Sequence, residues 1–226
     1  MAVTSTLVVR GEPSLDAAAD LDRSVGLLRA VADGTIEHDR VVRLYAPLPT
    51  VAMSRRESRM PGFVAASRAA TEHGFTPVVR PTGGRAVAYD PSCLVFDIVV
   101  REQGLGDQRE LFTRVGSALV SALRGLGVDA RLGDVAGEYC PGEFSVNARG
   151  AVKLVGTSQR AVRGARLLSG MVPLADVARL AEVLVAVNAA LGLDWDKATF
   201  GTLQQEPATQ PRMQIEDAIL GALIDL

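Results

Sequence analysis

One short segment of the sequence contains two side chains suited to chemistry, Cys140 and Lys153. It reads EYCPGEFSVNARGAVKLVGTSQR and runs from Glu138 to Arg160. Glycines on both sides of the cysteine and a proline directly after it place Cys140 on a loop, where functional residues concentrate. A nearby cation lowers the pKa of a thiol and raises its thiolate fraction. The alternative is that Cys140 is a small buried hydrophobe, and this is the preferred interpretation for Cys93, which precedes an apolar run.

The second residue, Lys153, is unusual because the chain contains 24 lysines and arginines, of which only Lys153 and Lys197 are lysines. A retained lysine is suited to what arginine cannot do, namely acting as a compact charge or losing its proton. Chance is the alternative, and it is preferred for Lys197. In a regular strand, Lys153 would share a face with Val155 and Thr157. A lysine in a sheet-walled cleft needs a partner such as an acyl carbonyl, a phosphate or a thiolate, and Gly156 would let a substrate chain pass close to the backbone.

A glycine-rich turn supplies a second set of candidate residues in the segment RPTGGRAVAYD, from Arg80 to Asp90. The consecutive Gly83 and Gly84 permit positive φ and close backbone approach. Backbone N–H groups in such a turn can hold a phosphate or carbonyl oxygen, and Arg80 and Arg85 add charge. The segment lacks both the P-loop ending and the dinucleotide fingerprint. Taken alone, the segment is more typical of a plain tight turn than of a binding loop.

Composition excludes several other classes of function. The chain has 226 residues, 48% of them hydrophobic, with a formal net charge of −2, so we expect a packed core and no attraction to nucleic acid. His38 and His73 are isolated, so no metal site is expected, and neither zinc nor serine-hydrolase motifs are present. The absence of a signal peptide and of a long apolar run predicts a cytoplasmic protein that does not enter membranes.

Apolar residues at spacings of three and four predict the helices. The first is expected to run from about Leu15 to Ala32 with Ser14 as its N-cap, and the second to carry Pro61 in its first turn and to stop at Gly74. Three further helices are predicted at residues 109–123, 174–192 and 214–226.

Short apolar or alternating runs predict the strands. They are expected at residues 40–46, 50–54, 76–80, 86–90, 94–100, 128–132 and 165–174, with a hairpin at 144–160 that turns at 147–150. Hairpin-like neighbours among helices indicate an α+β fold, with a mixed, mainly antiparallel sheet flanked by helices. We expect one domain over residues 1–226, in which 200–226 form a C-terminal loop and helix.

Two of these segments together resemble the lipoate/biotin protein ligase superfamily. The segments RPTGGRAV, from Arg80, and KLVGTSQR, from Lys153, match the family patterns R-x-x-G-G-G/R-x-V and K-x-x-G-x-[SA]-Q-[RQ] in order and spacing. The Y-C-P-G loop and the RMPGF segment are most similar to the cysteine-dependent octanoyl or lipoyl amidotransferases. Arg85 replaces the third glycine of the ligases, and Tyr89 stands where they usually carry histidine. Both departures weaken an ATP-dependent ligase interpretation.

The resemblance implies the biotin/lipoate ligase catalytic-domain fold, which is like that of class II synthetases, and a specific mechanism. Cys140 would take an octanoyl or lipoyl group as a thioester, and Lys153 would polarise the acyl carbonyl or favour the thiolate. The glycine turn and the backbone near Gly156 would stabilise the oxyanion and shape an apolar acyl tunnel. The substrate-binding residues implied by the two motifs are Arg80, Gly83, Gly84, Arg85, Gly156, Thr157, Ser158 and Gln159.

The resemblance also implies partners and leaves alternatives open. The acceptors would be lipoyl-domain proteins, namely the glycine-cleavage H protein and the E2 subunits of 2-oxoacid dehydrogenases, and the donor either an acyl carrier protein or an octanoylated H protein. No cofactor is required for this transfer. The first alternative is an ATP-dependent lipoate-protein ligase, which uses ATP and Mg²⁺ and binds the acyl-adenylate phosphate at Lys153. The second is a non-catalytic binding subunit of the same fold, and the third is an unrelated soluble α/β domain.

Overall fold

The computed structural model describes residues 5–14, 16–102, 107–175 and 177–226. Its largest element is a seven-stranded sheet with strand order β1-β2-β6-β10-β9-β8-β7. The bounds of its strands are β1 Thr6–Arg10, β2 Arg40–Tyr45, β6 Cys93–Arg101, β7 Ala130–Leu132, β8 Val146–Ala148, β9 Val152–Val162 and β10 Ala165–Pro173. Only the pair β1 and β2 is parallel, and the other pairs in this sheet are antiparallel. The predicted mixed, mainly antiparallel sheet is confirmed.

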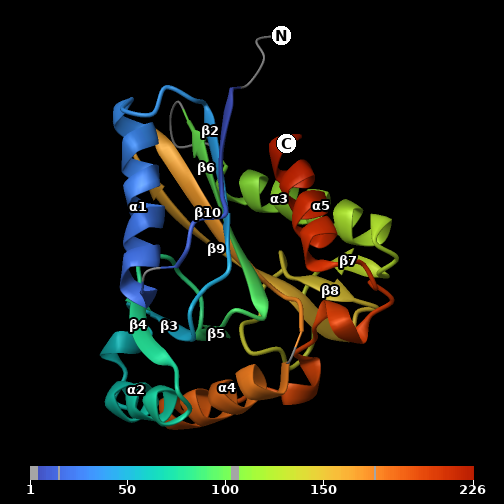
Figure 1. The fold of residues 1–226 in the computed structure, drawn as a ribbon. Coiled ribbons are helices and arrows are strands. Elements are labelled where there is room, and N and C mark those ends of the chain that lie inside the picture. The colour runs from blue at the N-terminus through green and yellow to red at the C-terminus, as the bar shows by residue number, and fades with distance from the viewer. Residues whose placement is uncertain (1–4, 15, 103–106, 176) are drawn as a thin grey trace.

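A smaller sheet of three strands lies at one end of the large one (Figure 1). It has the order β4-β3-β5, with bounds β3 Thr50–Ser54, β4 Thr76–Arg80 and β5 Val87–Tyr89. Strand β3 pairs in parallel with β4 and antiparallel with β5. The turn between β4 and β5 is the glycine-rich segment identified in the sequence, so this small sheet positions one wall of the site.

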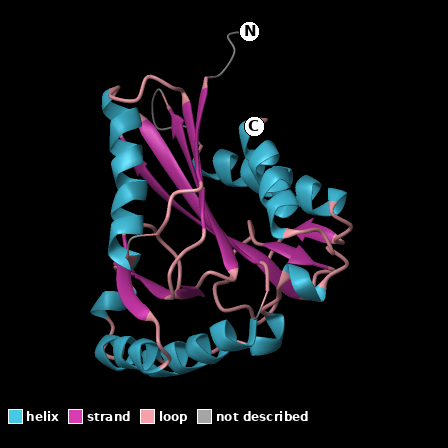
Figure 2. Ribbon diagram, in the orientation of Figure 1, coloured by secondary structure: helices cyan, strands magenta, loops and turns pink. Residues whose placement is uncertain are grey.

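Among the described residues, five α-helices cover the sheets, with bounds α1 Ala17–Asp33, α2 Phe63–Glu72, α3 Gln108–Gly125, α4 Val177–Leu191 and α5 Arg212–Ile224. Figure 2 shows α1 on one face of the large sheet and α3 with α5 on the other. Leu28 of α1 packs with Val99 of the sheet, whereas Leu119 of α3 packs with Ile98, which points to the opposite face. Helices α2 and α4 pack with the small sheet in a third cluster. No helix in the described part of the chain is long and apolar enough to span a membrane.

The structure corrects two predicted helix starts. The N-cap of α1 is Asp16, whose carboxylate accepts hydrogen bonds from the N–H groups of Ala18 and Ala19 at 2.9 and 2.8 Å. The prediction of Ser14 as the cap is therefore wrong, and the predicted first residue, Leu15, lies outside the described residues. An aspartate two residues later was an equally good cap, so composition alone could not decide between them.

Helix α2 begins at Phe63, so Pro61 lies before the helix and not in its first turn as predicted. The chain first makes a turn in which the Phe63 N–H donates to the Met60 carbonyl oxygen at 3.0 Å. Proline is suited to such a turn as well as to a first helical turn, which is why the sequence was ambiguous. Strand β1 was not predicted at all.

A β-bulge interrupts the pairing of β8 with β9 and changes which side chains face the site. Asn147 is paired with Lys153, whereas the preceding Val146 is paired with Val155, so β9 contains one extra residue at this point. Val155 therefore belongs to the core cluster beneath α3 and α5. The prediction that Lys153 and Val155 share one face is wrong, because it assumed unbroken alternation. Instead Gly156 lies beside Lys153, since a Cβ added there would be 3.1 Å from the lysine Cε.

Candidate active site

Three segments converge on one cavity of about 240 Å³. They are the loop 133–145 between β7 and β8, the turn 81–86 between β4 and β5, and the first half of β9. Much of the wall is apolar and comes from α1, α3, both sheets and the loop that carries Cys140. The apolar lining residues are Leu21, Tyr45, Ala52, Val87, Tyr89, Val95, Phe112, Tyr139, Phe144, Leu167 and Met171.

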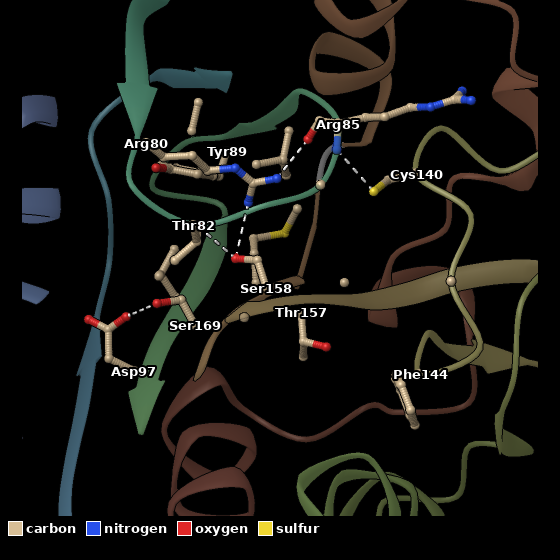
Figure 3. A pocket seen from close by; sticks show the side chains of 18 of the residues that line it. Arg80, Thr82, Arg85, Tyr89, Asp97, Cys140, Phe144, Thr157, Ser158 and Ser169 are labelled. Carbon is tan, nitrogen blue, oxygen red and sulfur yellow. Dashed lines mark hydrogen bonds between the residues drawn. The ribbon is translucent and has the colours of Figure 1, made fainter. Parts of the chain in front are cut away.

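The sulfur of Cys140 lies at the wall formed by the glycine turn. The backbone N–H of Arg85 donates a hydrogen bond to Cys140 Sγ at 3.2 Å (Figure 3). Gly84 allows this approach, because its φ is +97° and a Cβ added there would be 2.7 Å from Arg80 Nη2 and 3.4 Å from Cys140 Sγ. Both the backbone conformation and the space therefore require glycine at this position. An N–H group directed at the sulfur is suited to stabilising negative charge there.

The side chain of Arg80 links the glycine turn to β9. Its guanidinium donates to the Arg85 carbonyl oxygen at 2.7 Å and to Ser158 Oγ at 3.2 Å, and Ser158 donates to Thr82 Oγ1 at 2.9 Å. The side chain of Arg85, in contrast, points away from the sulfur in Figure 3 and reaches the Asp194 carbonyl oxygen at 3.4 Å. The two arginines thus differ, because Arg80 orders the turn with its charge whereas Arg85 offers its backbone to the thiol.

Glu57 holds the other end of the same turn. This carboxylate is buried and accepts hydrogen bonds from the N–H of Ala86 at 2.7 Å and from the N–H and hydroxyl of Ser54 at 2.7 and 2.9 Å. Each of its two oxygens is therefore used inside the protein. Glu57 fixes the start of β5 to the end of β3, which positions the Arg85 N–H.

Lys153 is buried and its ammonium contacts the cysteine loop. Lys153 Nζ donates to the carbonyl oxygen of Cys140 at 2.6 Å and lies 3.3 Å from Glu138 Oε1. It also lies 4.7 Å from the centroid of the Tyr139 ring. Burial raises the pKa of Tyr139 well above its ordinary value, so this phenol stays neutral. The ammonium is thus balanced by one carboxylate and oriented by one backbone carbonyl.

Glu138 also organises the loop that follows Cys140. Its Oε1 accepts hydrogen bonds from the Gly142 N–H at 3.0 Å and from Ser145 Oγ at 2.8 Å, in addition to the contact with Lys153. The other oxygen, Oε2, accepts from the Val135 N–H at 3.4 Å, so this buried carboxylate is well satisfied. The Cys140 loop is therefore attached to β9 through Lys153, which contacts both the Glu138 carboxylate and the Cys140 carbonyl oxygen.

The part of the cavity between α1 and the large sheet carries a polar group, Asp97. Its carboxylate accepts hydrogen bonds from Ser24 Oγ at 2.6 Å and Ser169 Oγ at 2.5 Å, and lies 3.4 Å from the Arg43 guanidinium. Arg43 in turn forms a 2.7 Å ion pair with Asp20. Burial raises the pKa of Asp97 despite these favourable contacts.

Most of the residues singled out in the sequence come together here. Arg80, Gly84, Arg85, Cys140, Lys153, Gly156, Thr157 and Ser158 line the cavity. Gly83 lines an adjoining outer cavity, and Gln159 is not among the lining residues of either one.

Cys93 is fully buried and its pKa is raised to about 12 by burial, which confirms its interpretation as a core residue. Among the described residues, no three His, Cys, Asp or Glu side chains gather as a metal site.

Sequence reasoning missed the two glutamates that fix the site. Glu57 and Glu138 lie in polar stretches, where an exposed glutamate is the usual expectation. Each accepts a hydrogen bond from a backbone N–H within four residues of itself. Such local contacts can be recognised only once the loop conformation is known, so the sequence alone did not indicate them.

Comparison with known proteins assigns the chain to a family. The model of the lipoyl protein ligase A/B catalytic domain family matches residues 17–199, and the chain belongs to this family. Crystallised lipoate-protein ligase A bound with ATP shares the fold, with a TM-score of 0.78 at 19% identity over 98% of this chain and 85% of that one. A putative lipoate protein ligase from T. acidophilum with bound lipoic acid gives a TM-score of 0.74 at 19% identity, over 99% of this chain and 86% of that one.

The curated relatives that the chain resembles in sequence share one name within that family. A protein of Exiguobacterium sp. named octanoyl-[GcvH]:protein N-octanoyltransferase is 32% identical over 58% of this chain and 46% of its own length. A protein of Geobacillus kaustophilus with the same name is 31% identical over 67% of this chain and 53% of its own length. The chain therefore spans about half the length of the curated relatives it matches.

Proposed function

We propose that the chain is an acyltransferase that moves an octanoyl or lipoyl group through a thioester on Cys140 onto a lysine of a lipoyl-domain protein. The observation that carries the proposal is the position of Cys140 Sγ, which accepts the Arg85 N–H at 3.2 Å at the wall of a largely apolar cavity. The octanoyltransferase relatives support the same class of reaction.

The first step is attack of the Cys140 sulfur on the acyl carbonyl carbon of the donor. The new S–C bond forms as the bond to the leaving group breaks, and the thiol proton leaves with that group as an amine or a thiol. In the second step the neutral amine of the acceptor lysine attacks the thioester. A C–N bond forms, the C–S bond breaks, and the amine proton returns to the sulfur.

Two groups of the protein support these steps in different ways. The Arg85 N–H, which lies against the sulfur, can donate to the thiolate and then to the tetrahedral oxyanion that forms beside it. Lys153 acts through the loop, because its ammonium holds the carbonyl group of Cys140 itself. Its own charge is paired with Glu138, and its contact with the loop fixes the backbone that carries the proposed nucleophile.

The apolar wall accounts for recognition of the acyl chain. Burying an alkyl chain contributes about 0.8 kcal/mol per CH₂, so an eight-carbon chain gains several kcal/mol from this cavity alone. The transfer needs neither ATP nor Mg²⁺, because the acyl group either arrives as a thioester or passes between two amides. An ATP-dependent ligase would instead need both, with Lys153 beside the acyl-adenylate phosphate.

The name of the curated relatives makes octanoylated glycine-cleavage H protein the proposed donor and a lipoyl-domain protein, such as an E2 subunit, the proposed acceptor. The test incubates the protein with an apo lipoyl domain and one of three donors, namely octanoyl-H protein, octanoyl-acyl carrier protein, or free octanoate with ATP and Mg²⁺. We expect transfer from the H protein without ATP, and loss of transfer in Cys140→Ala. Transfer from free octanoate that needs ATP and survives Cys140→Ala would reject the proposal.

The covalent intermediate is tested separately. A thioester donor is used, since an amide donor would not let the less stable enzyme thioester accumulate. Intact mass should show one added octanoyl group in the wild type and in Cys93→Ala, and none in Cys140→Ala. The Cys93 variant is the matched control, because that thiol is buried away from the cavity lining.

A further inference from the structure

A second cavity of about 590 Å³ adjoins the first on the other side of Cys140. The wall between the two consists of shared residues from the glycine turn and the cysteine loop. These shared residues are Pro81, Thr82, Gly84, Arg85, Cys140 and Pro141. Cys140 thus stands where an apolar inner cavity meets a separate outer one, which we call the vestibule. Its remaining lining residues are Ser54, Arg55, Arg56, Glu57, Met60, Gly83 and Leu193.

The vestibule is cationic. Three arginines, Arg55, Arg56 and Arg85, line it, and Arg55 and Arg56 are exposed. The one carboxylate among its lining residues, Glu57, is buried and already accepts hydrogen bonds from backbone and hydroxyl donors. In the described part of the chain, none of the three arginines forms an ion pair.

Other exposed arginines are of two kinds. Arg23, Arg109 and Arg131 each pair with a nearby carboxylate, whereas Arg29 and Arg163 form no ion pair in the described part of the chain. The vestibule differs from both because three arginines without ion pairs line a single cavity. A cluster of like charges without partners raises the electrostatic energy of the free protein, and a negatively charged partner offsets that cost. The positive charge of the vestibule is therefore complementary to a negatively charged surface on a partner.

The proposed reaction defines what must enter the vestibule. When the inner cavity holds the acyl chain, a lysine of the partner protein has to reach Cys140 from the outer side. Met60 and Leu193 are half-buried apolar residues along that way and suit the methylene groups of a lysine. A protonated lysine approaching Arg55 and Arg56 is repelled unless carboxylates accompany it on the partner's surface.

We infer that the vestibule is the docking surface for an acidic face of the protein that carries the substrate lysine, with Arg55 and Arg56 as its main recognition residues. This inference rests on the proposed acyl transfer. The same arginines also favour the neutral form of the incoming lysine, since nearby positive charge lowers the pKa of an ammonium group. Docking by flanking carboxylates and activation of the amine then arise from one set of charges.

The test measures binding without any chemistry. The probe is fluorescein-labelled apo glycine-cleavage H protein, and its dissociation constant is measured by anisotropy between about 0.05 and about 0.3 M salt. We expect binding that weakens as salt increases. Arg55→Glu/Arg56→Glu should weaken it about tenfold or more at low salt and flatten the salt dependence.

The matched control is Arg29→Glu/Arg163→Glu, which makes the same change of charge. Arg29 on α1 and Arg163 in the β9–β10 turn are exposed, and neither lines the vestibule. This control should bind like the wild type. Equal weakening in both double variants, unchanged binding in the vestibule variant, or no binding at low salt would each overturn the inference. Absence of an octanoyl adduct on wild-type Cys140 would reject the proposed function instead, and the binding data would still decide this inference.

Discussion

The ammonium of Lys153 donates a 2.6 Å hydrogen bond to the carbonyl oxygen of Cys140 while it lies 3.3 Å from the Glu138 carboxylate. The lysine is therefore bound to the backbone of the loop that carries Cys140, and the charge of the lysine is balanced within the protein. The sulfur receives its own hydrogen bond from elsewhere, the N–H of Arg85. The backbone of Cys140 and its sulfur are thus held by two different elements.

This arrangement predicts a large penalty for Glu138→Gln. The change leaves the buried Lys153 ammonium without its counter-charge, and breaking one side of a buried pair costs about 3–5 kcal/mol. The double variant Glu138→Gln/Lys153→Met removes both charges and should recover much of that loss. Urea denaturation of the single and double variants measures the coupling between the two residues.

The control for this cycle is an exposed pair in the same protein. Arg131 and Asp129 form an ion pair at 2.7 Å with both side chains about half exposed. Asp129→Asn should leave the urea midpoint nearly unchanged, because exposed pairs contribute little. A Glu138→Gln variant as stable as Asp129→Asn would contradict the role assigned to the buried pair.

A second prediction concerns the glycine turn, where neighbouring glycines serve as test and control. Gly84→Ala places a Cβ 2.7 Å from Arg80 Nη2 at a φ of +97°, whereas a Cβ at Gly83 meets no atom within 4 Å. We expect Gly84→Ala to cost about 1–2 kcal/mol in stability from the left-handed backbone alone. It should also slow octanoylation of Cys140 strongly, since the Arg85 N–H would be displaced. Gly83→Ala should acylate at the wild-type rate, and equal rates in the two variants would reject this account.

The sequence allowed the convergence on Cys140, Arg80 and Lys153 to be predicted, because each belongs to a segment with a local signature. A loop with flanking glycines, and two motifs with the order and spacing of a known family, can be recognised from neighbouring residues without knowledge of distant contacts. The antiparallel sheet followed from the same kind of local pattern, since apolar alternation reports burial on one face. Boundaries were less certain where two good caps or turn residues stood near each other, as at Ser14 and Asp16.

The remaining features depended on long-range contacts. The bulge in β9 arises from pairing with β8, so the sides on which Val155 and Gly156 lie could not be obtained from alternation. Asp97 sits in the apolar run of β6, and the serines that satisfy it are far away in the sequence, at 24 and 169. Arg55 and Arg56 lie in a polar stretch of the sequence without a recognisable motif, and only the folded chain brings them to the cavity that Cys140 also lines.

A third prediction uses the difference between the two cysteines. Burial raises the pKa of Cys93 to about 12, whereas Cys140 is half-buried at a cavity wall. Alkylation requires the thiolate, so iodoacetamide at a pH of about 8 should modify only Cys140 in the folded protein. After unfolding, both cysteines should react. Peptide mass analysis maps the modified residues, and rapid labelling of Cys93 in the native protein would contradict its assignment to the core.

The last prediction concerns Asp97 and the dependence of stability on pH. Burial raises the pKa of this carboxyl above its ordinary value of 3.8, so the folded state holds the proton more tightly than the unfolded state. The stability that this proton contributes is fully present below about pH 3.8. It is lost as the pH rises through the raised pKa of the folded state.

Asp97→Asn removes this titration while an amide can still hydrogen-bond to Ser24 and Ser169. We expect the variant to gain stability relative to the wild type as the pH is raised from about 3.8 towards neutrality. Urea midpoints of the two proteins across this range give the difference directly. A relative loss of stability in Asp97→Asn with rising pH would mean that the attraction of Arg43, 3.4 Å away, outweighs desolvation of the carboxylate. Asp97 would then be an ionised partner of Arg43 in the cavity wall, and not a buried protonated carboxyl group.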